Sequence, residues 1–447
     1  MTRFDDLDRA LVAFFDGEAA APAPDGLLEL VTMRTVQWHP RPAWQARLHA
    51  SSVRIAPASL PVSRALLVGI AVLLALATAL VVGSQLFPRP RAVLEIFEST
   101  GTLTSQTAYF APSARLSDGR AVLAGGRGDV TLFDPATGVF STVPAPGLYS
   151  YAAIAAADDT VLLLGQDIRK TDAQEGISVA RLDGRTGSTS AILASDATFG
   201  DVSSGSAFVG LSDGRVLIVG QKLAGADAGS GAALIYDPRT VAFVPGPDLS
   251  MLHGPAKAIA LPDGRVLLIE AADMDGTAPQ AMAILDSGGT TVVSAATIDG
   301  RDACTWTVLA DGRVVIAGGV STANGARDQT VLDTALLIDP RGAVVTVTPT
   351  GRMPEGRWMH GAALLSDGRV LLMGGDLAPA IPFAATASTV FYRPSTNDFT
   401  PGPAMARARI APKVVPLADG RVLVASHYGL APNAPATGAE LTAEVFQ

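Results

Sequence analysis

Apolar and polar positions alternate in a fixed order at Leu364–Gly375, which reads LLSDGRVLLMGG. A short apolar run is followed by Asp-Gly, by four consecutive apolar residues and by two glycines. Asp-Gly between apolar runs predicts a two-residue β-hairpin, because glycine adopts positive φ without steric cost. The consecutive apolar residues predict a strand buried on both faces. The two glycines end that strand and allow neighbouring backbone to come close.

The same order recurs along most of the chain. Its turn aspartates are Asp118, Asp158, Asp213, Asp263, Asp311, Asp367 and Asp419, and the copy at Asp158 is the weakest. Successive copies lie 40 to 56 residues apart. A period near 50 residues, built of short strands and turns, predicts the blades of a β-propeller.

A second phrase follows several of the hairpins, as in LFDPATG (Leu132–Gly138) and IYDPRT (Ile235–Thr240). Proline after aspartate favours a type I turn, so each phrase should close a second hairpin and complete four antiparallel strands. Together the two phrases resemble kelch repeats, as found in seven-bladed kelch propellers including the galactose oxidase family. The resemblance covers residues 93–447 and implies an all-β, seven-bladed kelch-type β-propeller.

The two ends of the repeat region are expected to close the ring. The chain begins this region with two expected strands, Ala92–Phe97 and Gly101–Ser105, and it ends with Glu440–Phe446, a third strand without a fourth. We expect an amino-terminal strand to complete the last blade, because ring closure removes an open sheet edge.

The residues before the repeats divide into three segments. Residues 1–64 carry two short amphipathic patterns and predict a short helical tail. Residues 65–83 contain no charge over nineteen positions and predict a transmembrane helix. Residues 84–92 form a linker that contains Pro88 and Pro90.

The positive charges around the span predict the orientation of the chain. Arg47, Arg54 and Arg64 precede the span, and Arg89 and Arg91 follow it. This bias favours a single-pass protein of the cell membrane with a cytoplasmic amino terminus and an extracytoplasmic propeller. Residues 1–64 then become available to a cytoplasmic partner. That layout resembles membrane-bound anti-sigma factors, which makes transmembrane signalling, with the propeller as sensor, one alternative function.

Composition excludes some functions and leaves others open. The chain carries 33 basic and 42 acidic residues, for a net charge of −9, which argues against nucleic-acid binding. Cys304 is its one cysteine, so neither a disulfide nor a cysteine-based zinc site can form within one chain.

The loops between the second and third strands of each blade differ from one copy to the next, and we place the binding surface there. Function tends to lie on variable loops held by a rigid frame. The candidate binding residues on these loops are Asp167, Asp273, Asp275, Arg327, Asp328, Asp376, His427 and Tyr428. The predicted ligand is a protein or a glycan, bound by a membrane-anchored module without enzymatic activity.

The resemblance also raises the alternative of a degenerate copper radical oxidase. That chemistry implies two histidines and two tyrosines around copper, with one tyrosine crosslinked to a cysteine. Arg357–Gly361 resembles the family's Arg-x-Tyr-His-Ser phrase, but Met359 stands where the tyrosine ligand would be. His253 precedes another hairpin at a place that looks the same as that of His360. We therefore expect no copper site and no cofactor, and we expect both histidines to be structural.

Overall fold

The computed structural model describes residues 95–103, 113–124, 129–144, 147–156, 158–169, 176–196, 206–221, 231–250, 252, 256–270, 279–289, 292–321, 329–342, 344–379, 384–425 and 442–447. All of them belong to one compact unit, Ala92–Gln447. The predicted tail, transmembrane helix and linker lie outside the described residues. Within the described ranges, no helix is long and apolar enough to cross a membrane.

The described residues form strands, which confirms the predicted all-β class. Their sheets comprise seven with four or five strands and one with three. The first four sheets contain β2 (Ser113–Arg115), β3 (Ala121–Ala124), β4 (Asp129–Asp134) and β5 (Val139–Pro144); β6 (Leu148–Ala155), β7 (Thr160–Asp167), β8 (Ile177–Asp183), β9 (Ser188–Thr189) and β10 (Ala194–Asp196); β11 (Ala207–Gly210), β12 (Val216–Gln221), β13 (Gly231–Asp237) and β14 (Ala242–Pro245); and β15 (Ala256–Ala260), β16 (Val266–Glu270), β17 (Gln280–Leu285) and β18 (Val292–Ile298).

The remaining sheets complete the chain. They contain β19 (Arg301–Asp302), β22 (Val320–Ser321) and β23 (Thr330–Val331); β20 (Thr305–Val308), β21 (Val314–Ala317), β24 (Ala335–Asp339) and β25 (Thr346–Pro349); β26 (Gly361–Leu364), β27 (Val370–Met373), β28 (Thr389–Arg393) and β29 (Asp398–Pro401); and β30 (Lys413–Pro416), β31 (Val422–Ala425), β32 (Thr442–Phe446) and β1 (Phe97–Thr102).

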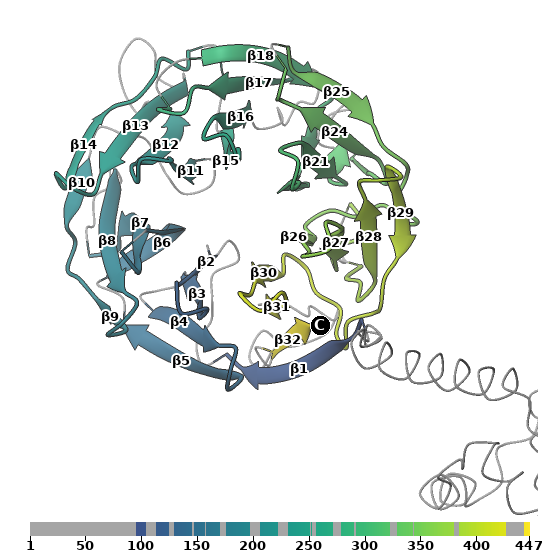
Figure 1. Cartoon of the computed structure of the whole chain (residues 1–447), viewed down its shortest axis with the longest axis horizontal. Coiled ribbons are helices and arrows are strands. Elements are labelled where there is room, and N and C mark those ends of the chain that lie inside the picture. Colours follow the sequence, from purple (N-terminus) through teal and green to yellow (C-terminus); the bar gives the residue numbers. More distant parts are fainter. Residues whose placement is uncertain are drawn as a thin grey trace, which may run out of the picture. The chain divides into compact units, whose positions relative to one another are not determined.

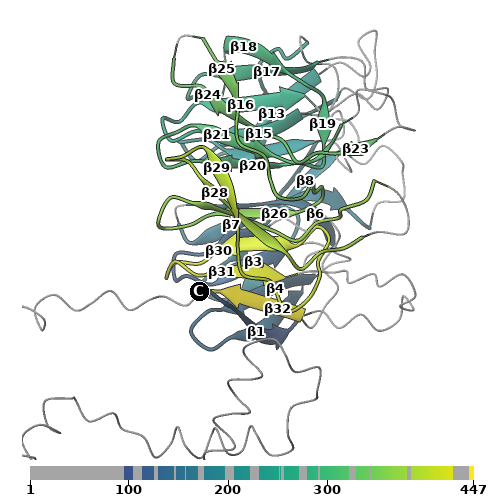
Figure 2. The same ribbon diagram turned by 90° about the vertical axis from the view of Figure 1, so that its right-hand side faces the viewer.

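The larger sheets follow one another around a ring, each running from an inner to an outer strand (Figure 1). Figure 2, turned by 90°, shows the strands running between two faces of this propeller-like unit. The core lies between neighbouring sheets, where apolar side chains of both sheets pack together. Val266 and Leu268, for example, pack with Leu217 and Val219 of the preceding sheet. Alternate side chains of β16 pack against the preceding sheet and the following sheet, so all of its residues are buried.

The Asp-Gly turns are three-residue loops, so the predicted two-residue hairpin is wrong. At the turn of β26 and β27, Leu365 N donates to Arg369 O at 2.8 Å and Gly368 N donates to Leu365 O at 3.0 Å. Gly368 has a φ of +85°. This is a type I turn followed by a left-handed glycine, a geometry for which Asp-Gly serves as well as for a two-residue loop.

The arginines after five of the Asp-Gly turns link neighbouring sheets at the face that carries these turns, which we call the turn face. Arg265 illustrates the arrangement: its Nε donates to Asp263 Oδ2 at 2.8 Å, and its Nη2 donates to Pro340 O of the next sheet at 2.8 Å. Equivalent contacts join Arg120 to Gly184 O, Arg215 to Gly288 O, Arg369 to Glu95 and Arg421 to Pro135 O. The repeated arginine therefore fastens one sheet to the next.

The predicted closure of the ring by an amino-terminal strand of the repeat region is confirmed. β1 pairs antiparallel with β32, and the sheet runs β1-β32-β31-β30. The expectation of two separate strands at this end is wrong, because Phe97–Thr102 is one strand with a register shift between Thr100 and Thr102. Gly101 lies at that shift, where glycine in a strand marks a bulge.

Candidate functional site

The face opposite the turn face receives the ends of β27 and β31 and the connections into β26 and β30. We call it the loop face. Among the described residues, three arginines are buried there at equivalent places: Arg301 before β20, Arg357 before β26 and Arg409 before β30. They are 5%, 1% and 2% exposed. Buried guanidinium groups need hydrogen-bond acceptors. The groups that accept from these three arginines are therefore the contacts that hold the loop face together.

Each of these arginines donates to at least one backbone carbonyl at a strand end of the four-stranded sheet that follows it along the chain. Arg357 Nη1 donates to Gly374 O at 3.0 Å and to Ser388 O at 3.1 Å. Arg301 Nη1 donates to Gly318 O at 3.4 Å and to Thr334 O at 3.2 Å. The side chains thereby hold the end of the second strand against the start of the third.

The glycine pairs that end the second strands connect to the next sheet. Gly319 N donates to Arg357 O at 2.9 Å, and Gly375 N donates to Arg409 O at 2.7 Å. A Cβ on Gly374 would lie 2.5 Å from Arg409 O, closer than real Cβ contacts. The prediction that these glycines admit neighbouring backbone is therefore confirmed.

Backbone hydrogen bonds also join the connections of successive sheets. Met359 N donates to Ala303 O at 2.9 Å, and Ala411 N donates to Met359 O at 2.7 Å. All three residues have positive φ, near +50°. Non-glycine residues seldom adopt this conformation, and its repetition shows that the surrounding contacts impose it. The last three sheets thus share one continuous backbone network on the loop face.

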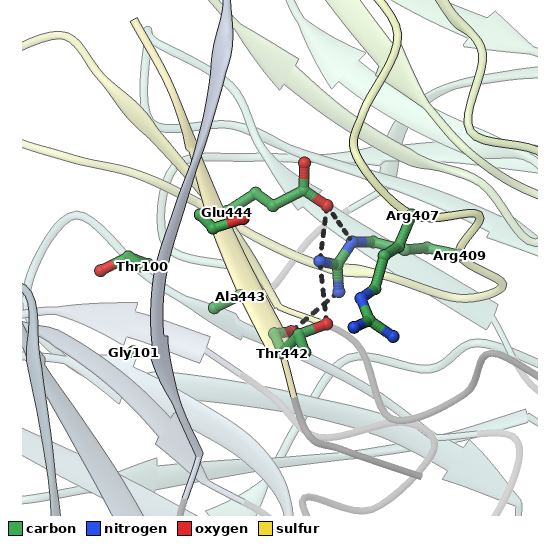
Figure 3. A pocket seen from close by; sticks show the side chains of 8 residues that line it. Thr100, Gly101, Arg407, Arg409, Thr442, Ala443 and Glu444 are labelled. Atoms are coloured by element: carbon green, nitrogen blue, oxygen red, sulfur yellow. Dashed lines mark hydrogen bonds and ion pairs between the residues drawn. The ribbon is translucent and has the colours of Figure 1, made fainter.

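A cavity of about 390 Å³ opens on the loop face where the ring closes (Figure 3). It lies between the connection into β30 and the paired strands β32 and β1. The residues that line it are Ser99, Thr100, Gly101, Arg407, Arg409, Thr442, Ala443 and Glu444. Since β1 and β32 come from opposite ends of the repeat region, this cavity exists only when the ring is closed.

An ion pair between Arg409 and Glu444 forms the inner wall of the cavity. Arg409 Nη2 donates to Glu444 Oε1 at 2.7 Å and Nε donates to the same oxygen at 3.1 Å. The other carboxylate oxygen accepts Ala406 N at 2.7 Å, and Arg409 Nη1 donates to Thr442 O at 2.8 Å. The Glu444 side chain is 1% exposed, so the pair is shielded from water and its hydrogen bonds fix its geometry.

Arg407 is exposed and lines the same cavity. Figure 3 shows its guanidinium beside that of Arg409 and near Thr442. Two of the three charged residues in the wall, Arg409 and Glu444, compensate each other.

The described residues around His360 do not fit the copper site that the resemblance implies. His360 is buried, its Nε2 lies 2.8 Å from Thr305 Oγ1, and its Nδ1 has no hydrogen-bond partner in the described part of the chain. Met359 stands at the position of the expected tyrosine ligand and has no phenolic oxygen to bind copper. Burial raises the pKa of the Cys304 thiol to about 11, which keeps it protonated at neutral pH. Across the described ranges, no group of three or more His, Cys, Asp or Glu is placed to hold a metal ion.

The pH dependence of stability should report the burial of His360. Burial and the nearby charge of Arg357 lower the pKa of His360 from 6.5 to about 3. Below pH 6.5 the unfolded chain binds a proton that the folded chain does not, so this contribution to stability is complete above pH 6.5 and falls as the pH drops toward 3. The loss by pH 5 amounts to about 2 kcal/mol. Thermal midpoints at pH 7 and pH 5 should therefore differ more in the wild type than in His360→Gln; equal differences would contradict the assignment.

Two of the eight candidate loop residues lie within the described part, and both are buried. Asp167 ends β7 and pairs with Arg169 at 2.8 Å. Asp376 Oδ1 accepts Ala378 N at 3.0 Å and Ala384 N at 2.7 Å, which shapes the loop after β27. Its Oδ2 is buried with no hydrogen-bond partner among described residues. These carboxylates act on their own loops. The other six, Asp273, Asp275, Arg327, Asp328, His427 and Tyr428, lie outside the described residues.

Sequence reasoning missed the buried arginines, although a signal for them exists. Arg301, Arg357 and Arg409 each stand ten residues before the turn aspartate of their repeat. The same count places His253 at the sequence position of Arg357 and not at that of His360, and His253 itself lies outside the described residues. Arginine in phase with the hairpin phrase therefore marks the loop-face network.

Comparison with known proteins supports the fold. No family model matches the chain, and no curated protein matches its sequence. Among solved structures, the chain is similar to a fungal alcohol oxidase of the AA5 family in complex with copper, with a TM-score of 0.59 and 14% identity over 79% of this chain and 76% of that one. A second similar structure is YjhT, with a TM-score of 0.47 and 13% identity over 67% of this chain and 99% of that one. At such identities, the likeness to the oxidase concerns the galactose oxidase-like propeller fold alone.

Proposed function

We propose that this chain is a membrane-anchored, seven-bladed kelch-type propeller that binds a protein or glycan through its loop face. In this proposal each of the seven larger sheets is a blade. Residues 65–83 cross the membrane once, the amino terminus is cytoplasmic and the propeller is extracytoplasmic. Residues 1–64 offer a cytoplasmic partner a binding segment.

One observation carries the binding role: the two faces of the ring differ in construction. On the turn face, short repeated turns are fastened to each other by the arginines that follow Asp-Gly. On the loop face, a buried network supports the cavity between Arg407 and Glu444. A rigid frame beneath variable loops is the usual arrangement of a binding surface.

The location of the propeller is tested with a carboxyl-terminal tag on the full chain. Intact cells are treated with protease and blotted for the tag, together with a cytoplasmic control protein. The proposal expects loss of the tag while the control survives. A tag that is lost only after lysis would place the propeller in the cytoplasm and overturn this part.

The binding face is tested with two charge reversals at exposed residues. Asp302→Lys changes the loop face before β20, and Arg185→Glu changes the turn between β8 and β9 on the opposite face. The full chains are tested on a glycan array and by protein crosslinking on intact cells. We expect binding in the wild type and in Arg185→Glu, and reduced binding in Asp302→Lys. Equal loss in both variants, or loss in Arg185→Glu alone, would contradict a loop-face site.

Two other functions remain alternatives. Signalling through residues 1–64 depends on a segment outside the described residues, and capture of a sigma factor by that tail would support it. A degenerate copper oxidase finds support only in the fold. Elemental analysis that finds about one copper per purified chain would favour it over a binding module.

A further inference from the structure

We propose that the turn face of the propeller contacts the phospholipid surface of the membrane that anchors the chain, through exposed apolar side chains at its outer rim. The inference rests on the proposed function, because it requires the predicted membrane span at residues 65–83. It extends that function by assigning a partner to the face that the proposed binding surface does not use.

The rim side chains occupy equivalent places in four sheets. Seven large apolar side chains are exposed among the described residues. Four of the seven lie at the turn face, at the start of the outermost strand of a sheet or one or two residues before it. They are Ile96 before β1, Val139 at the start of β5, Val241 before β14 and Val344 before β25. Their exposed fractions range from 38% for Ile96 to 70% for Val344.

These side chains are spread around the ring. Figure 1 shows that β1, β5, β14 and β25 follow the outside of the ring and that β14 and β25 lie far from β5. A compact macromolecular partner is recognised by apolar side chains that gather in one patch. Apolar contacts at three or more separate points of one face define a plane. A bilayer surface, which is flat and extended, fits that arrangement.

The chain enters this unit at the same face. Phe97 pairs with Phe446 at the end of β32, and Glu95 Oε1 accepts from Arg369 Nη2 at 2.5 Å, directly after an Asp-Gly turn. Eleven residues separate Glu95 from the predicted span, and they reach at most about 40 Å when extended. The tether therefore arrives at the rim that carries Ile96.

The tether determines whether so small an apolar surface can bind lipid. Complete burial of a valine or isoleucine side chain contributes about 1.5–3 kcal/mol, and these four are already partly buried. A free protein would lose this gain to the entropy of association, whereas a short linker supplies an effective concentration in the millimolar range. Contacts too weak to recruit a free propeller can therefore orient a tethered one.

The charges of the turn face do not oppose this contact. The aspartates of six Asp-Gly turns each pair with the arginine two residues later. Arg265 Nη2, for example, lies 2.7 Å from Asp263 Oδ2. The paired carboxylates are compensated, and the exposed Arg239 and Arg393 on neighbouring turns favour anionic headgroups.

The test places a fluorophore on each face of the full chain. Val344→Cys and Ile168→Cys introduce a thiol at an exposed apolar position of the turn face and of the loop face, respectively. The native Cys304 is buried, and wild type treated with the same label is the blank for it. The chains carry an NBD label and are reconstituted into vesicles of phosphatidylcholine and phosphatidylglycerol that contain a spin-labelled lipid as quencher.

We expect the label at position 344 to lose about half or more of its emission, because interfacial side chains enter about 5–10 Å into the headgroup region. The label at position 168 should be unaffected. Val139→Asp and Val241→Asp, added to Val344→Cys, should restore most of the emission. Equal quenching at both positions, or none at position 344, would overturn the inference. A label at position 344 that is shielded from water but not quenched by lipid would also overturn it, in favour of a second copy or another protein.

Flotation of the vesicles separates this inference from the proposed function. A chain that floats without quenching at position 344 retains its membrane anchor, and only the rim contact fails. A chain that does not float lacks the proposed anchor, and the rim contact fails with it. Ligand binding by the loop face is measured separately, with Asp302→Lys on the array.

Discussion

Glu444→Gln is expected to lower the free energy of unfolding by about 3–5 kcal/mol, the range seen when one partner of a buried ion pair is removed. The substitution keeps the shape of the side chain but leaves the Arg409 guanidinium charged and buried, at 2% exposure. Chemical unfolding of the full chain, followed by tryptophan fluorescence, measures the change.

An exposed ion pair provides the matched control for this variant. Arg352 and Asp333 lie 2.6 Å apart, but their side chains are 70% and 36% exposed. Asp333→Asn should therefore cost less than about 1 kcal/mol. The double variant Arg409→Met with Glu444→Gln should be more stable than Glu444→Gln alone, because the uncompensated charge is gone. Similar losses for Glu444→Gln and Asp333→Asn would show that the buried pair does not hold the closing sheet.

Removal of residues 442–447 is expected to abolish folding into a soluble monomer. β32 lies between β31 and β1, so its loss leaves β1 without a strand partner. It also removes Val445 and Phe446 from two separate apolar clusters of the core. Exposed apolar surface and free strand edges favour aggregation, which size-exclusion chromatography detects.

Deletion of Gln447 alone is the control for this truncation. Gln447 is exposed and donates its backbone N–H to Ile96 O at 3.1 Å, outside the paired strands. Its loss should leave the chain monomeric with a similar melting curve. A monomeric chain with unchanged melting after removal of the whole strand would refute closure through β32.

The sequence carried enough information for the class of the fold and for the closure of its ring. Asp-Gly and Asp-Pro recur in phase, and each places a turn between short apolar runs, so the alternation of strand and turn is local information. Closure could be inferred because Glu440–Phe446 lacked a following strand and the segment before Ser113 had none to pair with. The turn geometry could not be chosen, because a left-handed glycine satisfies both the two-residue and the three-residue loop.

The site depended on contacts that a repeat pattern does not contain. Glu444 meets Arg409 only through the register of β32 with β31 and β1, across 35 residues of sequence. Asp376 was expected to bind a ligand because it begins a variable loop after the glycine pair, whereas its carboxylate accepts from backbone N–H groups of its own loop. Asp376 is buried because its loop folds back over the carboxylate, and the local sequence pattern does not encode that fold.

The pairing of the first and last strands also sets an order of events during synthesis. Glu98 and Gln447 contact each other across 349 residues of chain. At about 5–20 residues per second, β1 leaves the ribosome roughly 20–70 s before its partner strand exists. During that time its edge is open to other chains, and a growing polypeptide of this kind is a natural client for chaperones. The ring can therefore close only after β32 has been synthesised, and not when any earlier repeat is completed.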